Sequence, residues 1–364
     1  MKKIFYFIIL LVGVVIANTA CDDWTEVEML HPTSMDGTSF SDEYYANLRA
    51  YKKSDHPVAF GWYGHWNGKG SSLDNCMIGL PDSVDFVSMW GNWKSPSEAM
   101  LQDLRIVQEK KGTKALVVFL FFDLGDQITP EEYSATLADR HKFWGWVDGD
   151  DKAIEASIIK YANAICDTID KYNYDGFDLD WEISTPQPPE IENNIKREMR
   201  AQGRIDIFIE AMSKRIGPKS GTDKYFVIDG EITNVPAKYA SYFNYFIKQA
   251  YTCTGEDELN EIFSSLVHKY SSELPAEELA KRLIVTEDFE KYAQKGGYDF
   301  VTSDGETIKS LEGMARWNPV VDGKKVRKGG VGTYHMEYEF HIAGYPESYP
   351  YMRNAIRLMN PPVK

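Results

Sequence analysis

The stretch Tyr174-Asp175-Gly176-Phe177-Asp178-Leu179-Asp180-Trp181-Glu182 places three acids, at positions 178, 180 and 182, in alternation with two apolar residues. Residues two apart in a β-strand point to the same face, so the three carboxyl groups would converge on one side. A buried carboxylate is costly unless it is paired, so three in succession need an explanation. Three interpretations are open: solvated acids on an exposed strand, a site for a hard cation, or acid/base chemistry.

The surrounding residues favour acid/base chemistry. Leu179 and Trp181 are suited to packing between a sheet and its helices, and Tyr174 and Phe177 make the flank apolar, which disfavours an exposed strand. Mg²⁺ usually combines one or two carboxylates with substrate phosphates, and the sequence contains no phosphate-binding loop. When carboxyl groups lie close together, their repulsion raises the pKa of one of them and leaves another ionised. Acid/base catalysis requires such a pair of protonated and ionised groups.

The stretch resembles the D-x-x-D-x-D-x-E signature of glycoside hydrolase family 18, with Asp175, Asp178, Asp180 and Glu182 at its acidic positions. The resemblance implies an α/β fold, a (β/α)8 TIM barrel forming one catalytic domain over residues 55–364, whose fourth strand ends in this motif. It implies that Glu182 is the general acid/base, that Asp180 orients the 2-acetamido group of the substrate and that Asp178 shares a proton with Asp180. The acetamide oxygen would then be the nucleophile. Asp175 is assigned to substrate binding.

A second motif, Gln249-Ala250-Tyr251, resembles the Q-x-Y at the end of the sixth strand in several members of this family. Gln249 and Tyr251 are two residues apart, so they would face the same way as the carboxyl groups. The resemblance implies that Tyr251 donates to the acetamide oxygen and that Gln249 holds the sugar. A chance polar pair at a strand end is the alternative.

Aromatic and polar residues near other expected strand ends are further candidates. Trp62 and Tyr63, Trp90 and Trp93, and Tyr334 could be platforms for sugar rings, or they could be core residues. A set of polar residues could bind sugar hydroxyls or be satisfied structural groups: Asp123, Glu287, Asp288, His335 and Glu337.

Short apolar segments alternate with helical patterns along the chain, as expected for a barrel of strands and helices. The expected strands are 58–62, 84–90, 114–122, 174–182, 224–229, 245–251, 282–286 and 331–336. The expected helices are 42–51, 97–110, 153–172, 193–216, 259–270 and 348–359. Residues 298–328, with clusters of Gly, Asp and Lys, predict a hairpin-bearing insertion before the last strand.

Composition excludes several classes of protein. The 364 residues carry a net charge of −15 without a dense run of Lys and Arg, which argues against nucleic-acid binding. Cys76, Cys166 and Cys253 are an odd number without close spacing, which predicts buried thiols and not a disulfide framework or a zinc site. The sequence predicts no cofactor and no metal, and we expect a monomer.

Residues 1–21 are predicted to be a targeting segment, with two lysines followed by an apolar run shorter than the roughly 20 residues that span a membrane. The run ends in Asn18-Thr19-Ala20-Cys21, which resembles a loose lipobox, and this resemblance implies that Cys21 is lipidated. The two aspartates that follow are similar to the export signal of some Gram-negative surface lipoproteins, which implies an outer-membrane location. Ordinary cleavage after Ala20, giving a periplasmic or secreted protein, is the alternative. Residues 22–54 would be a tether with a short helix.

Three functions remain open: an endo-β-N-acetylglucosaminidase acting on N-linked glycans, a chitinase, and a non-catalytic glycan-binding lipoprotein. Chitinases of the family usually carry S-x-G-G on the third strand, whereas residues 119–125 read Phe-Leu-Phe-Phe-Asp-Leu-Gly. This departure favours the first function, cleavage of the GlcNAc-β1,4-GlcNAc core. A binding protein is disfavoured because no acid of the signature is missing.

Overall fold

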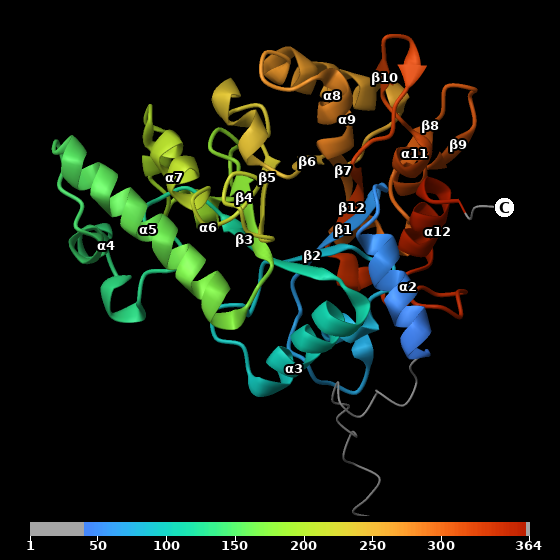
Figure 1. Cartoon of the computed structure of the whole chain (residues 1–364), viewed down its shortest axis with the longest axis horizontal. Coiled ribbons are helices and arrows are strands. Elements are labelled where there is room, and N and C mark those ends of the chain that lie inside the picture. The colour runs from blue at the N-terminus through green and yellow to red at the C-terminus, as the bar shows by residue number, and fades with distance from the viewer. Residues whose placement is uncertain (1–39, 362–364) are drawn as a thin grey trace, which may run out of the picture.

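The computed structural model describes residues 40–361, and a closed barrel of eight parallel strands lies at its centre (Figure 1). Each strand pairs in parallel with its neighbours, and the last strand pairs with the first. Around the barrel the strands are β1 (Val58–Tyr63), β2 (Phe86–Met89), β3 (Lys114–Leu120), β4 (Gly176–Trp181), β5 (Tyr225–Gly230), β6 (Phe246–Gln249), β7 (Leu283–Asp288) and β12 (Gly330–Tyr334). The prediction of a (β/α)8 TIM barrel is confirmed.

Helices lie outside the barrel (Figure 1). They are α2 (Asp42–Lys52), α3 (Glu98–Ile106), α4 (Leu137–Trp144), α5 (Asp151–Tyr172), α6 (Pro189–Glu192), α7 (Arg204–Met212), α8 (Glu256–Tyr270), α9 (Ala276–Arg282), α10 (Phe289–Tyr292), α11 (Ser310–Arg316) and α12 (Pro350–Met359). Helix α3 continues into a π-helical turn, Val107–Lys111, so the expected helix at 97–110 is present in two forms.

The prediction of one helix over 193–216 is wrong. The segment contains α7 preceded by a separate 3-10 turn, Glu198–Arg200, and two residues with left-handed backbone, Arg197 and Gly203, interrupt it. A long-range contact explains the interruption, because the buried carboxylate of Asp123 accepts hydrogen bonds from the backbone N–H groups of Lys196 (2.7 Å) and Glu198 (2.8 Å). These bonds replace the helical ones that local sequence favours.

Strand β4 is held tightly between β3 and β5. A Cβ atom on Gly176 would lie 2.0 Å from the carbonyl oxygen of Tyr225, so no larger residue fits there. Phe177 and Leu179 are fully buried in the layer between barrel and helices, while Asp178 alternates with them and faces the barrel interior. The expected alternation of acids and apolar residues is therefore confirmed.

The insertion before the last strand contains hairpins, as expected. Strands β8 (Asp299–Val301) and β9 (Thr307–Lys309) form one, and β10 (Val320–Val321) and β11 (Lys324–Lys325) form another. Cys76, Cys166 and Cys253 are buried free thiols, as predicted. Among residues 40–361 no helix is long and apolar enough to cross a membrane. The targeting segment, Cys21 and most of the expected tether lie outside the described residues.

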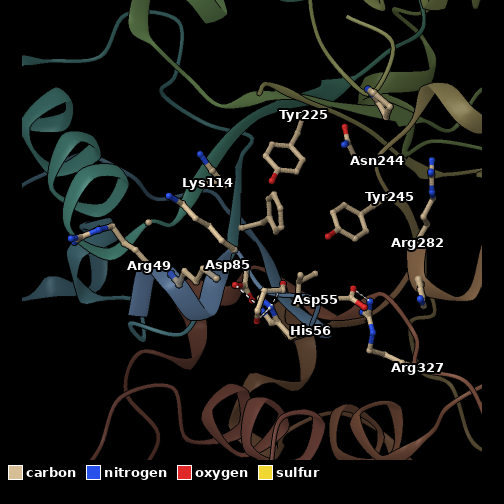
Figure 2. A pocket seen from close by; sticks show the side chains of 18 of the residues that line it. Arg49, Asp55, His56, Asp85, Lys114, Tyr225, Asn244, Tyr245, Arg282 and Arg327 are labelled. Atoms are coloured by element: carbon tan, nitrogen blue, oxygen red, sulfur yellow. Dashed lines mark hydrogen bonds and ion pairs between the residues drawn. The ribbon is translucent and has the colours of Figure 1, made fainter. Parts of the chain in front are cut away.

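A cavity of about 790 Å³ lies at the N-terminal ends of the barrel strands (Figure 2). Several of its charged groups form pairs: His56 Nε2 lies 3.0 Å from Asp85 Oδ1, and Arg327 contacts Asp55. Catalytic sites of TIM barrels form at the opposite, C-terminal face. The paired charges indicate a structural role for this end of the barrel.

Candidate active site

A cleft of about 510 Å³ opens at the C-terminal ends of the strands. Three strands or their ends supply its main polar groups: β4 carries Asp180 and is followed by Glu182, β5 carries Asp229, and β6 carries Gln249 and is followed by Tyr251. The structure thus brings the two predicted motifs together around one space. Aromatic side chains complete the lining: Trp62, Trp90 and Tyr334.

Asp178 lies at the bottom of this group and is fully buried. Its Oδ2 accepts hydrogen bonds from Trp62 Nε1 (3.0 Å) on β1 and from Ser88 Oγ (2.8 Å) on β2. Burial raises the pKa of Asp178 to about 6, although hydrogen bonds from Ser88, Asp229 and Trp62 act in the opposite direction. The carboxyl group of Asp229 interacts with that of Asp178 in the barrel interior, and burial raises the pKa of both.

Asp180 and Asp229 lie opposite each other in the β4–β5 ladder. Burial raises the pKa of Asp180 well above its usual value, and the charges of Glu182 and Asp178 raise it further. Burial likewise raises the pKa of Asp229, together with the charges of Asp180 and Asp178. The three carboxyl groups are close together and shielded from solvent, so their titrations are coupled. They retain protons at pH values at which isolated aspartates are ionised.

Glu182 occupies a different environment from the three aspartates. It follows the last residue of β4, is only partly buried, and its Oε2 accepts a hydrogen bond of 2.7 Å from Gln187 Nε2 in the following loop. This position leaves the carboxyl group facing the cleft, where it can exchange a proton with a bound substrate.

Gln249 and Tyr251 extend the site from β6. Gln249 Nε2 donates to Asp229 Oδ1 at 3.0 Å, so this amide is joined to the buried carboxyl groups. The ring of Tyr251 stacks on that of Tyr334 at 6.1 Å. Burial raises the pKa of Tyr251 well above its usual value, which keeps its hydroxyl protonated and able to donate.

Three of the predicted substrate contacts are wrong. Tyr63 is fully buried and donates from its hydroxyl to the carbonyl of Asp74 at 2.5 Å, because its neighbour Trp62 already faces the barrel interior. Trp93 is buried against Phe119, with ring centroids 5.6 Å apart, and does not line the cleft.

Asp175 is the third, because it lies at the opposite end of β4 from Glu182. There its carboxylate accepts from Lys114 Nζ at 3.0 Å and from the backbone N–H of Ala115 at 2.9 Å. The polar candidates Asp123 and Glu287 are structural: each accepts hydrogen bonds from backbone N–H groups of neighbouring segments.

Asp229 is a candidate site residue that the sequence did not single out. The fifth strand was expected to end at this residue, and that position at a strand end is the only signal the sequence offers, because the pairing with Asp180 is visible only in the structure. Gln187 and Glu290, which also line the cleft, lie in segments without any recognisable motif.

The chain matches the description "Glycoside hydrolase family 18, BT1044-like" over residues 24–358. It is 28% identical over 343 residues to endo-β-N-acetylglucosaminidase F2 of Elizabethkingia meningoseptica. The alignment covers 89% of this chain and 88% of that protein. A solved BT1044 structure shares 30% identity and superposes with a TM-score of 0.72, covering 91% of this chain and 94% of the other. An endo-β-N-acetylglucosaminidase of Cordyceps militaris, 18% identical, shares the fold with a TM-score of 0.58, covering 92% of this chain and 100% of its own.

The agreement extends over nearly the whole chain and includes the barrel that carries the acidic motif. The protein therefore belongs to glycoside hydrolase family 18, in its BT1044-like group.

Proposed function

We propose that the protein is an endo-β-N-acetylglucosaminidase that hydrolyses the GlcNAc-β1,4-GlcNAc core of N-linked glycans by a substrate-assisted, retaining mechanism. The observation that carries the proposal is the arrangement of Glu182, Asp180 and Tyr251 around one cleft. The names of the relatives support the same activity, since endo-β-N-acetylglucosaminidase F2 aligns with 89% of the chain.

In the proposed first step, Glu182 donates its proton to the glycosidic oxygen as the bond to C1 breaks. The acetamide oxygen of the same sugar attacks C1 and forms a cyclic oxazolinium ion. Tyr251 donates to that oxygen and Asp180 accepts from the acetamide N–H, so both contacts strengthen as charge develops. Glu182 then removes a proton from water, which opens the ring with net retention.

The buried carboxyl groups give Asp180 a way to change its charge during this step. The positive charge of the oxazolinium ion favours an ionised Asp180, and the neighbouring carboxyl groups of Asp229 and Asp178 would take up the proton that leaves it. Gln249 orients Asp229 through its 3.0 Å hydrogen bond. In this scheme the proton stays inside the barrel, where no water has to carry it.

Incubation with a panel of glycoproteins, followed by mass spectrometry, tests the proposal. Release that leaves one GlcNAc on asparagine is the expected result. Chitobiose from chitin would instead indicate a chitinase, and the absence of any release would indicate a glycan-binding protein.

A matched pair of variants tests the role of Glu182. Glu182→Gln should lower kcat by about 10²–10⁴-fold, the usual contribution of a positioned general acid. Glu190→Gln removes the same charge from exposed helix α6 nearby and should leave kcat unchanged. A Glu182→Gln rate above about a tenth of the wild-type rate would contradict the assignment.

We also propose that the protein is a surface lipoprotein, anchored in the outer membrane through Cys21. The lipobox-like residues before Cys21 and the two aspartates after it support this proposal. An anchored enzyme would act on glycans outside the cell.

A further inference from the structure

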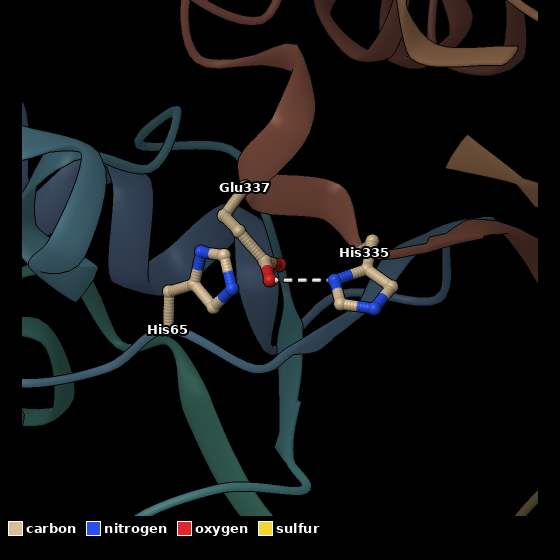
Figure 3. A group of neighbouring side chains, drawn as sticks. All are labelled: His65, His335 and Glu337. Atoms are coloured by element: carbon tan, nitrogen blue, oxygen red, sulfur yellow. Dashed lines mark hydrogen bonds and ion pairs between the residues drawn. The ribbon is translucent and has the colours of Figure 1, made fainter. Parts of the chain in front are cut away.

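Two histidines and a glutamate lie together beside the cleft: His65, His335 and Glu337 (Figure 3). One possible ligand atom from each lies within 4.8 Å of those of the other two. His65 lies two residues after β1 and His335 directly follows β12, and these two strands pair with each other to close the barrel. The three side chains therefore meet where the first and last strands of the barrel end.

Glu337 has an unused bonding position. Its Oε1 is shared between His335 Nδ1 (2.8 Å) and the backbone N–H of Gly64 (3.2 Å). Its Oε2 is buried and finds no hydrogen-bond donor among residues 40–361. A buried carboxylate oxygen without a hydrogen-bond partner destabilises the folded protein. A cation bound to that oxygen would remove the destabilisation.

His65 gives the group access to solvent. It is exposed, whereas His335 and Glu337 are 4% and 5% exposed, so an ion can reach the buried pair from the side where His65 lies. The ring of His65 lies 6.0 Å from that of His335, in an edge-to-face arrangement. A structural His335–Glu337 pair needs no third residue, whereas a metal site needs one.

We propose that His65, His335 and Glu337 bind a divalent transition-metal cation, for which Zn²⁺ is the best fit. Two imidazoles and one carboxylate form a known ligand set of Zn²⁺, and the fourth tetrahedral position remains for water. Ca²⁺ and Mg²⁺ prefer oxygen ligands and are poorly matched to two imidazoles.

The geometry requires the side chains to adjust around the ion, because the possible ligand atoms now lie within 4.8 Å of one another. Bonds of about 2.0–2.1 Å to a tetrahedral ion place ligand atoms ~3.3 Å apart. The ion would bind at the free Oε2 of Glu337, and His335 Nδ1 would exchange its hydrogen bond to Oε1, now 2.8 Å, for a bond to the ion. Coordination through Nδ1 moves the proton of that atom to Nε2 of the same ring, so the neutral ring keeps its charge.

The site is separate from the proposed chemistry, because none of its three residues lines the cleft. It nevertheless touches the cleft wall: the ring of His335 lies 5.1 Å from that of Trp90 and 4.5 Å from that of Tyr334, and both line the cleft. A bound ion would join the segments after β1 and β12 and fix this wall.

Calorimetric titration of ZnCl₂ into the EDTA-treated and dialysed protein, prepared without a polyhistidine tag, tests the inference at pH 7.5. One ion should bind per chain. His65→Ala, which removes an exposed ligand without disturbing the buried pair, should weaken binding at least tenfold, since even residues that only orient a ligand are worth about 10–100-fold. His268→Ala removes another exposed histidine, on α8, and should bind as the wild type does.

Glu337→Gln separates a metal ligand from a structural residue. The amide oxygen can still accept from Gly64, so the fold should persist by circular dichroism, while the loss of the carboxylate should weaken Zn²⁺ binding. Failure of the wild type to bind Zn²⁺, or equal affinity of His65→Ala and His268→Ala, would overturn the inference. Glycan release by the wild type is independent of either result.

Discussion

Replacing Asp178 by Asn should stabilise the protein at pH 7 while impairing catalysis. Burial raises the pKa of Asp178 from 3.8 to about 6, and one pKa unit corresponds to about 1.4 kcal/mol. The folded state therefore binds more protons than the unfolded state between these two pH values, and the free energy of unfolding falls as pH rises through that window. Asn is uncharged at every pH, and its side-chain oxygen can still accept from Trp62 and Ser88.

The raised pKa predicts that Asp178→Asn is more stable than the wild type at pH 7, by up to about 3 kcal/mol. At pH 4 the wild-type carboxyl group is already protonated in the folded state, and the gain should fall below about 1 kcal/mol. For a protein of about 320 described residues the unfolding entropy is about 0.7 kcal/mol per kelvin, so the Tm at pH 7 should rise by up to about 4 °C.

Differential scanning calorimetry at pH 4 and pH 7 measures both quantities and avoids the isoelectric point near 5.0, where the protein is least soluble. Asp223→Asn is the control, because Asp223 is exposed and its replacement should leave the Tm nearly unchanged at both pH values. A lower Tm for Asp178→Asn at pH 7, or a gain of the same size at both pH values, would refute the reasoning.

Three further changes test other parts of the structure. Trp62→Phe removes a hydrogen bond that lowers the pKa of Asp178, so the pH profile of kcat/KM for glycan release should move to higher pH. An unshifted profile would show that Trp62 does not influence catalysis through Asp178. Gly176→Ala forces a Cβ against the carbonyl of Tyr225 and should destabilise the protein by about 1–3 kcal/mol or more, measured by urea unfolding; an unchanged midpoint would contradict the close approach. Cys21→Ala should move the protein from the membrane to the soluble fraction, and unchanged fractionation would exclude lipidation.

Two short motifs and their resemblance to those of a known family predicted the barrel and several residues that line the cleft. The alternation around Asp178 and Asp180 and the apolar runs of the other strands depend on residues close together in sequence. Gln249 and Tyr251 are also close together in sequence. Because they are two residues apart, their side chains point to the same face of a strand. These features needed no knowledge of how distant segments meet.

The errors arose where distant segments decide the outcome. Asp229 becomes part of the site only through its register with Asp180, which sequence spacing does not contain. Asp123 interrupts the expected helix at 193–216 by binding backbone N–H groups more than 70 residues away. Trp62 and Tyr63 were assigned together although adjacent strand residues face opposite ways, an error that the period of the strand alone could have prevented.

Strand β4 runs through the barrel with Asp175 at one end and Glu182 beyond the other, and this arrangement divides the signature into two halves that evolution can lose independently. Gly176 and the Asp175–Lys114 ion pair stabilise the barrel. Their presence in a relative would therefore indicate only that the barrel still folds. A relative that has lost Glu182 could keep the barrel, its cleft and its ligand and no longer cut the bond. A match to the Asp175–Gly176 half of the signature therefore indicates a shared barrel, whereas under the proposed mechanism the residue at the position of Glu182 decides whether that barrel is still a hydrolase.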